Sequence, residues 1–196
     1  MTALRVPYRG DRDYVHGTTL FGLLSDHCLV PGASALDFRV NRRIDSNAFF
    51  LHEDLTAAEA LRHPCSLAYE AGGTVRACAV EEAPCGDASM RQPYDEEALV
   101  AAARFIPQGQ SVAYELESGT PFIDALVALN KALLKRHSPL PAGSQFVFTR
   151  LELPAPPPTA GRLEIAFWRS LGGAHFISRL QVDGSPSGRI HFSSWG

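Results

Sequence analysis

Two short segments carry side chains that could exchange protons with a substrate. His16 and Tyr14 lie beside Asp13 at the start of a predicted helix, and Asp124 lies in the first turn of a second, longer one. Histidine is the commonest general acid or base in enzymes, and carboxylate and tyrosine side chains also serve. A reaction that removes one proton and protonates a leaving group needs one base and one acid. Asp124 and Tyr14 also have a purely structural interpretation. The helix dipole alone favours a carboxylate in the first turn, where Asp124 lies, and a tyrosine such as Tyr14 often packs in a core.

The elements that would position these residues occur twice along the chain. Each half shows a Val-x-Tyr strand, a helix, a further strand and a hairpin at a Gly-Gly pair. In the first half these lie at 5–8, 13–27, 36–40 and Gly72-Gly73, and in the second at 111–114, 120–136, 145–149 and Gly172-Gly173. A unit too small to close its own core is stabilised by packing against its copy. The repeat therefore predicts a pseudo-dimer with a site where the halves meet.

The second helix has the clearer pattern. Its apolar residues fall at helical spacing, which predicts a largely buried helix, and Ser118 or Thr120 would cap its start. These apolar residues are Phe122, Ile123, Leu126, Val127, Leu129, Leu133 and Leu134. The first helix is shorter and its apolar residues are Leu20, Phe21, Leu23 and Leu24. Strands in both halves alternate apolar and polar residues, as in a sheet with one face exposed to water.

The composition excludes several classes of protein. The chain has 196 residues, 45% hydrophobic and 20% charged, and its net charge of −3 gives no reason to expect nucleic acid or a membrane as partner. No apolar run reaches the ~18 residues of a membrane span, and the charges near the start exclude a secretory signal, so we expect a cytoplasmic protein. Four cysteines without CxxC spacing favour free thiols. The histidines other than His16 show no ligand spacing, so neither metal nor cofactor is predicted.

Two motifs resemble those of a known family. Segment 13–22, Asp-Tyr-Val-His-Gly-Thr-Thr-Leu-Phe-Gly, is similar to the first-hotdog motif of polyketide-synthase dehydratase domains, Asp-His-x-Val-x-Gly followed by Pro-Gly. Segment 121–126, Pro-Phe-Ile-Asp-Ala-Leu, is similar to their second-hotdog motif, in which a Pro precedes Leu-Leu-Asp-Ala. The resemblance implies an α+β double hotdog, two fused copies of a long helix wrapped by an antiparallel sheet.

The resemblance also implies a reaction. In that family a His of the first hotdog and an Asp of the second meet where the two hotdogs pack together. They remove water from a β-hydroxyacyl thioester on acyl carrier protein, in polyketide or fatty-acid-type metabolism. Here His16 or Tyr14 would be the base and Asp124 the acid. The sequence departs from the family at three places. When Val15 and Gly17 are aligned with the family motif, the family's His falls on Tyr14. The Pro of the family's Pro-Gly is missing before Gly22, and Ala128 stands where the family has Gln or His.

Three alternative functions remain open. A tyrosine in place of the histidine resembles double-hotdog relatives that catalyse acyl transfer and decarboxylation. Segment 10–13, Gly-Asp-Arg-Asp, resembles the Asp-x-Asp motif of hotdog acyl-CoA thioesterases, in which Asp13 would activate water or act as the nucleophile. The third alternative is a non-catalytic double hotdog that binds an acyl chain or a partner protein.

The expected organisation is one compact pseudo-dimeric domain, with a first hotdog repeat over 1–82, a linker over 83–110 and a second repeat over 111–196. A substrate tunnel along the long helix would be lined by Phe122 and Leu126, with Asn130 as a further contact. Backbone N–H groups near Gly17 would polarise the thioester carbonyl.

The expected partner is an acyl carrier protein or coenzyme A thioester, bound by a monomer or a homodimer. An acidic carrier protein would need a local basic patch, which the sequence suggests at Arg39, Arg42 and Arg43.

Overall fold

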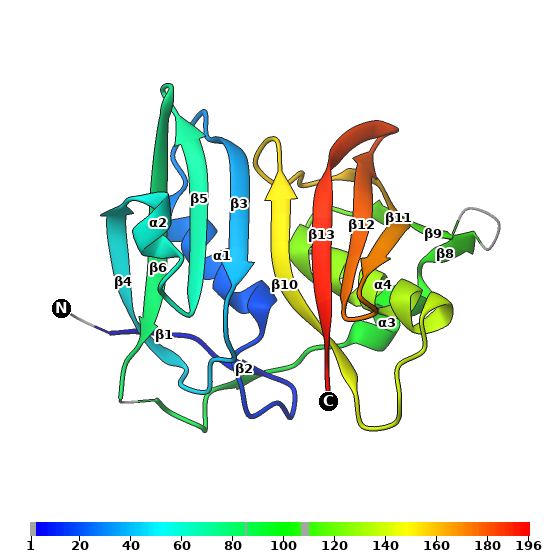
Figure 1. The fold of residues 1–196 in the computed structure, drawn as a ribbon, viewed down its shortest axis with the longest axis horizontal. Coiled ribbons are helices and arrows are strands. Elements are labelled where there is room, and N and C mark those ends of the chain that lie inside the picture. The colour runs from blue at the N-terminus through cyan, green and yellow to red at the C-terminus, as the bar shows by residue number, and fades with distance from the viewer. Residues whose placement is uncertain (1–2, 85, 107–109) are drawn as a thin grey trace. The chain divides into compact units, whose positions relative to one another are not determined.

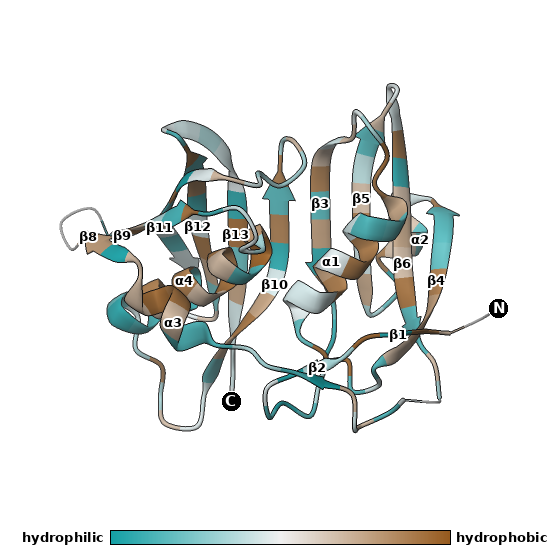
Figure 2. Cartoon of the chain, turned by 180° about the vertical axis from the view of Figure 1, so that it is seen from behind, coloured by the Kyte–Doolittle hydropathy of each residue, from teal (hydrophilic) through white to brown (hydrophobic). Residues whose placement is uncertain are grey.

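A computed structural model describes residues 3–84, 86–106 and 110–196 of the chain. These residues form two compact units, the first ending at Asp95 and the second beginning at Glu96. Each unit is built on an antiparallel sheet, and its longest helix packs on one face of that sheet (Figure 1, and from behind in Figure 2). No helix within the described ranges is long and apolar enough to cross a membrane.

The first unit contains two helices and a sheet with strand order β1-β4-β6-β5-β3. A short parallel pair, β2 with β7, lies apart from that sheet. The elements are β1 (Leu4–Arg5), β2 (Tyr8–Arg9), α1 (Gly17–Cys28), β3 (Ser34–Val40), β4 (Ala48–Leu55), α2 (Ala57–Ala60), β5 (Cys65–Ala71), β6 (Thr74–Glu82) and β7 (Arg91–Gln92).

Helix α1 packs on β5 and β6 through the apolar residues that the sequence pattern indicated. Leu20, Phe21 and Leu24 are buried, and the ring of Phe21 meets that of Phe38 edge to face. The β5–β6 hairpin turns at Gly72-Gly73, where both residues have positive φ (57° and 76°). A tight turn with two positive φ angles favours glycine, which adopts them at little steric cost, so the predicted hairpin is confirmed.

The second unit has sheet order β10-β13-β12-β11-β9-β8. Its helix α4 packs on β9, β10 and β11, and α3 lies against α4. The elements are α3 (Glu96–Ala101), β8 (Arg104–Ile106), β9 (Ser111–Leu116), α4 (Phe122–His137), β10 (Gln145–Leu153), β11 (Gly161–Leu171), β12 (His175–Val182) and β13 (Ser185–Trp195).

Helix α4 is buried over its whole first half, Phe122–Asn130, as its apolar stripe predicted. Its start differs from the prediction. The N-cap is Pro121, which makes no side-chain cap hydrogen bond, so the predicted capping by Ser118 or Thr120 is wrong. Proline has a φ close to the helical value and no N–H to satisfy, so it can begin a helix without a capping side chain.

The cysteines within the described ranges are free thiols. Cys28, Cys65 and Cys78 are all buried in the first unit, while Cys85 lies outside the described residues. Burial raises the pKa of the Cys65 thiol, and contact with Cys28 together with burial raises the pKa of Cys78. Protonated, inaccessible thiols are poor nucleophiles, so these residues act as small core side chains.

Candidate functional site

His16 is the N-cap residue of α1 and is only 7% exposed. Its backbone is extended (φ −72°, ψ 139°), and its carbonyl oxygen accepts the hydrogen bonds of the Thr19 and Leu20 N–H groups at 3.0 and 3.3 Å. The imidazole does not cap the helix. Instead, its Nδ1 lies 2.9 Å from the hydroxyl of Thr18, which is itself buried. A hydrogen bond at one ring nitrogen sets the tautomer and the orientation of the ring.

Tyr94 lies beside His16 in the first unit, and two arginines in turn contact the Tyr94 ring. The rings of His16 and Tyr94 are tilted by 49° with centroids 5.4 Å apart. The guanidinium carbons of Arg9 and Arg12 lie 4.9 and 5.3 Å from the centre of the Tyr94 ring. Arg9 Nε also donates to the Thr19 hydroxyl at 2.8 Å, so cation–π and hydrogen-bond contacts hold the start of α1 against the segment that contains Tyr94.

Sequence reasoning missed Thr18 and Tyr94. The contact of Thr18 with His16 could have been predicted, because a hydroxyl two residues after a histidine at a helix start is close enough to hydrogen-bond to its ring. Tyr94 gives no such signal, since its contact with His16 depends on the tertiary fold.

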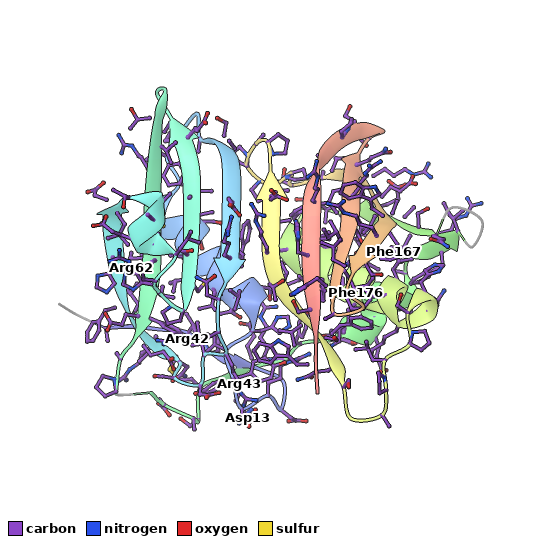
Figure 3. All side chains as sticks on the ribbon, in the orientation of Figure 1. Asp13, Arg42, Arg43, Arg62, Phe167 and Phe176 are labelled. Atoms are coloured by element: carbon purple, nitrogen blue, oxygen red, sulfur yellow. The ribbon has the colours of Figure 1, made fainter. Side chains whose placement is uncertain are left out.

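Asp13 and Tyr14 have a different environment. The Asp13 side chain is 81% exposed and its carboxylate lies 2.8 Å from Arg43, which also binds Asp45 at 2.6 Å (Figure 3). The same guanidinium lies 5.0 Å from the centre of the Tyr14 ring. Hydrogen bonding to Asp45 raises the pKa of Arg43. Asp13 is therefore a solvated, ion-paired carboxylate, whereas His16 is buried.

Asp124 is the third residue of α4 and is 7% exposed. Its N–H donates to the Pro121 carbonyl oxygen at 3.0 Å. Phe122 and Leu126, the predicted substrate contacts on the same helix, are 5% and 0% exposed, and Ala128 is also buried. Both His16 and Asp124 are thus buried polar residues at the start of the main helix of their own unit, the arrangement in which titratable groups are candidates for function.

Asn130 is the most unusual polar residue of α4. It is fully buried, and within the part of the chain that the structure describes neither its amide nitrogen nor its amide oxygen has a hydrogen-bond partner. Leaving a buried amide unsatisfied costs about 1–3 kcal/mol. A native protein rarely retains such a group without a reason, and a polar ligand atom that reaches α4 would supply one.

We therefore expect Asn130→Leu to raise the free energy of unfolding by about 1–3 kcal/mol, because it removes an unsatisfied amide at similar volume. Urea unfolding of both proteins measures this. Asn47→Leu is the matched control, since Asn47 is also fully buried but exchanges two hydrogen bonds with the Asp87 backbone at 2.8 and 2.7 Å. It should destabilise the protein. A loss of stability in Asn130→Leu would contradict the expectation.

A groove of ≈ 670 Å³ lies between α3, β8 and α4 in the second unit. Its apolar lining includes Val100, Phe105, Ala128 and Ala132. Charged residues border it, with Lys131 Nζ 3.1 Å from Glu96 and the Arg136 guanidinium 3.4 Å from the centre of the Phe105 ring. Its volume is that of a small-ligand site. Phe122 and Leu126 are not among its lining residues.

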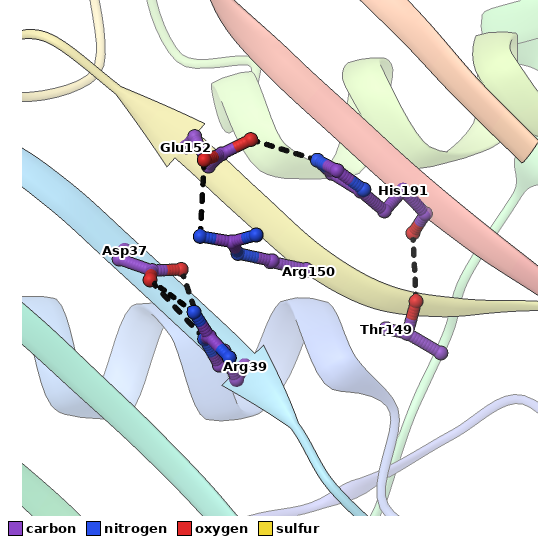
Figure 4. Close-up of polar contacts among 6 residues, drawn as sticks. All are labelled: Asp37, Arg39, Thr149, Arg150, Glu152 and His191. Carbon is purple, nitrogen blue, oxygen red and sulfur yellow. Dashed lines mark hydrogen bonds and ion pairs between the residues drawn. The ribbon is translucent and has the colours of Figure 1, made fainter. Parts of the chain in front are cut away.

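Most of the predicted basic patch is neutralised by neighbouring carboxylates. Arg39 is held by Asp37 at 2.8 Å, as Figure 4 shows, and Arg43 by the two aspartates described above. Arg42 is exposed. Two of the three guanidinium groups are therefore already engaged by carboxylates of the first unit.

Unpaired positive charge gathers instead around Trp168 on the second unit. Guanidinium carbons of Arg169, Arg179 and Arg189 lie 4.1, 4.3 and 5.3 Å from the centre of its ring. We call these four residues the Trp168 cluster. The register of β11 against β12 shifts between Phe167 and Arg169. Such a bulge re-aims side chains, so Trp168 and Arg169 share one face although they are adjacent.

The Trp168 cluster brings like charges together. Arg179 and Arg189 are direct cross-strand partners, which is destabilising on its own. Arg189 also lies opposite Glu152, but that carboxylate contacts Arg150 at 3.0 Å and His191 at 2.8 Å (Figure 4). Among the described residues, the three arginines of the cluster have no carboxylate partner. An anionic partner would relieve their repulsion.

No protein-family model matches this sequence, and no curated protein is similar enough to match it. Solved structures do match. The dehydratase domain of PpsC from Mycobacterium tuberculosis, in complex with C12:1-CoA, is 9% identical with a TM-score of 0.50, over 93% of this chain and 85% of that one. A protein assigned as a thioesterase II from Thermobifida fusca YX is also 9% identical with a TM-score of 0.50, over 98% of this chain and 90% of that one.

These similarities extend over nearly the whole chain and include both units. The helix-on-antiparallel-sheet architecture of each unit agrees with them. The expected α+β fold class is thereby confirmed. The chain has a double-hotdog fold similar to that of polyketide-synthase dehydratase domains.

Proposed function

We propose that this chain removes water from a β-hydroxyacyl thioester carried by acyl carrier protein or coenzyme A. The observation that carries the proposal is the pair of buried polar residues at equivalent helix starts, His16 at the N-cap of α1 and Asp124 in the first turn of α4. A base and an acid in water-poor surroundings are what this elimination requires.

In the proposed reaction, His16 takes the proton from the carbon next to the thioester carbonyl. Asp124, in its acid form, protonates the departing β-hydroxyl group, which leaves as water. The remaining electron pair forms the carbon–carbon double bond of the enoyl thioester. Backbone N–H groups at the start of α1, from Gly17 onward, would polarise the thioester carbonyl, because the first N–H groups of a helix have no intrahelical partner.

His16 is favoured over Tyr14 and Asp13 by its surroundings. It is buried and oriented by Thr18, whereas Arg43 contacts both Asp13 and Tyr14 and the Asp13 side chain is mostly exposed. A carboxylate in water is a weak nucleophile and a weak base, which makes hydrolysis through Asp13 the less favoured reaction.

The test uses the full chain and β-hydroxyacyl thioesters of several lengths on N-acetylcysteamine, coenzyme A and an acyl carrier protein. Loss of one water by mass spectrometry, with the ultraviolet absorbance of an enoyl thioester, supports dehydration. Release of free thiol that Asp13→Ala abolishes would replace the proposal with hydrolysis. Saturable binding of an acyl thioester without turnover would replace it with a non-catalytic acyl-binding role.

Thr18 is proposed as a positioning residue for His16. Thr18→Val keeps the shape of the side chain but removes the hydroxyl at Nδ1, so we expect kcat for dehydration to fall about tenfold, the effect of one hydrogen bond. Thr18→Ser keeps the hydroxyl and should recover most of the rate. If both variants have wild-type kcat and pH profile, Thr18 has only a packing role.

The Trp168 cluster is the proposed docking surface for an acidic carrier protein. Each exposed charge contributes roughly 0.2–1 kcal/mol, so Arg179→Ala with Arg189→Ala should raise KM for a carrier-linked substrate by about two- to thirtyfold. KM for the N-acetylcysteamine thioester should not change. Arg76→Ala, an exposed arginine of the first unit, is the control. An equal effect on both substrates would exclude carrier docking there.

A further inference from the structure

Two histidines and a glutamate that are far apart in the sequence come together on the first unit. His52 lies on β4, Glu81 on β6 and His63 in the loop between α2 and β5. His52 Nε2 is 3.0 Å from Glu81 Oε2, and the two imidazole rings have centroids 4.8 Å apart with an angle of 34°. One potential ligand atom from each residue lies within 4.8 Å of the others.

The backbone holds these three positions independently of one another. β4 and β6 are paired so that Phe50 is opposite Glu81, which places the His52 and Glu81 side chains diagonally across two hydrogen-bonded strands. The His63 N–H donates to the Ala60 carbonyl at 3.2 Å, and its carbonyl accepts from the Asn41 side-chain amide at 2.9 Å. The backbone contacts of each segment therefore bring the three donors together.

Two imidazole nitrogens and one carboxylate oxygen form a donor set that Zn²⁺ prefers, with a fourth position left to water. Bonds of about 2.0–2.1 Å in a tetrahedral site place the donor atoms about 3.3 Å apart. His52 and Glu81 already meet this spacing, and the remaining separations must close by up to about 1.5 Å. The His52 and Glu81 side chains are 28% and 55% exposed, so they have room to rotate.

The surroundings of the three residues contain features that favour metal binding and one that opposes it. Burial lowers the pKa of His63, as do the nearby His52 and Arg42, and this favours the neutral imidazole that binds metals. The positive charge of Arg42 opposes a cation, while the carboxylate of Glu81 favours one. The competing interpretation is a His52–Glu81 hydrogen bond with the His63 ring packed at a tilt beside His52.

We propose that His52, His63 and Glu81 bind one Zn²⁺ ion, which ties the loop after α2 to strands β4 and β6. Nothing in this proposal depends on the dehydratase reaction. Because the ion would bind the folded unit and connect three of its segments, it should stabilise that unit.

The test is a calorimetric titration of the full chain with Zn²⁺, followed by thermal unfolding with and without the ion. We expect one equivalent to bind and the Tm to rise in a saturable way. His63→Gln and His52→Gln should each weaken binding at least about tenfold. His27→Gln is the matched control, because His27 is exposed on the same unit and should leave binding unchanged.

Two further measurements keep the proposal falsifiable if a variant folds poorly. Co²⁺ bound to the unmodified chain should show the visible absorption of a tetrahedral site, and Zn²⁺ should protect His52 and His63 from diethyl pyrocarbonate. Absence of binding at millimolar Zn²⁺, or binding that both substitutions together leave unchanged, would overturn the proposal. The cluster would then be a hydrogen-bonded surface pair only.

Discussion

Replacing His16 with glutamine is expected to lower kcat for dehydration by about 10²–10⁴-fold, the usual contribution of a positioned general base. Glutamine occupies a similar volume and can still hydrogen-bond to the Thr18 hydroxyl, but it cannot take up the α-proton. The rate of enoyl thioester formation measures the effect. His175→Gln is the control, because His175 lies at the exposed end of β12 in the second unit, where its Nδ1 is 2.9 Å from the Ser193 hydroxyl.

Asp124→Asn tests the other half of the same reaction. Asparagine cannot protonate the leaving group, so we expect a fall in kcat of similar size. Residues that act as one catalytic unit are strongly non-additive, and the double variant should therefore be little worse than the poorer single variant. If Asp124→Asn has wild-type kcat, its carboxylate only stabilises the helix start and the proposed acid is wrong.

Gly188→Ala is expected to destabilise the protein strongly, lowering the free energy of unfolding by about 3 kcal/mol or more. Gly188 has a φ of 131°, a conformation that side chains rarely adopt. An added Cβ would overlap the carbonyl oxygen of Glu152 on the neighbouring strand and lie 3.1 Å from its carbonyl carbon. Because both are backbone atoms of a paired strand, neither can move without breaking the β10–β13 ladder.

The matched control for this experiment is Gly184→Ala. Gly184 also has a positive φ (77°), but an added Cβ would meet nothing within 4 Å. Its cost should be limited to the backbone strain, about 1 kcal/mol. Urea unfolding midpoints of the two variants separate the steric contact from backbone strain. Equal stability losses would show that the approach to Glu152 has no energetic consequence.

Local patterns predicted the main elements well. The apolar stripe of α4 and the Gly-Gly turns were readable because helical spacing and positive φ depend on residues that are neighbours in the chain. The predicted cap of α4 was wrong, because the N-cap position is occupied by Pro121, whose side chain has no hydrogen-bond acceptor. Strand β4 was not predicted, since Phe49, Phe50 and Leu51 follow one another without the alternation of a half-exposed strand.

The surroundings of the candidate residues could be predicted only in part. Thr18 is a sequence neighbour of His16, but Tyr94 reaches His16 through tertiary packing. The bulge at Trp168 reversed the face on which Arg169 would otherwise lie, and no residue type in the segment indicates it.

The sequence by itself determined the repeated helix-and-strand pattern, the burial of α4 and the placement of His16 and Asp124 at helix starts, because periodicity and turn chemistry act over a few residues. Tertiary structure decided which of these side chains are buried, and it brought His52, His63 and Glu81 together. It also left Asn130 without a partner among the described residues. The physical reason is that burial, cross-strand register and hydrogen-bond satisfaction depend on segments that meet only when the chain is folded.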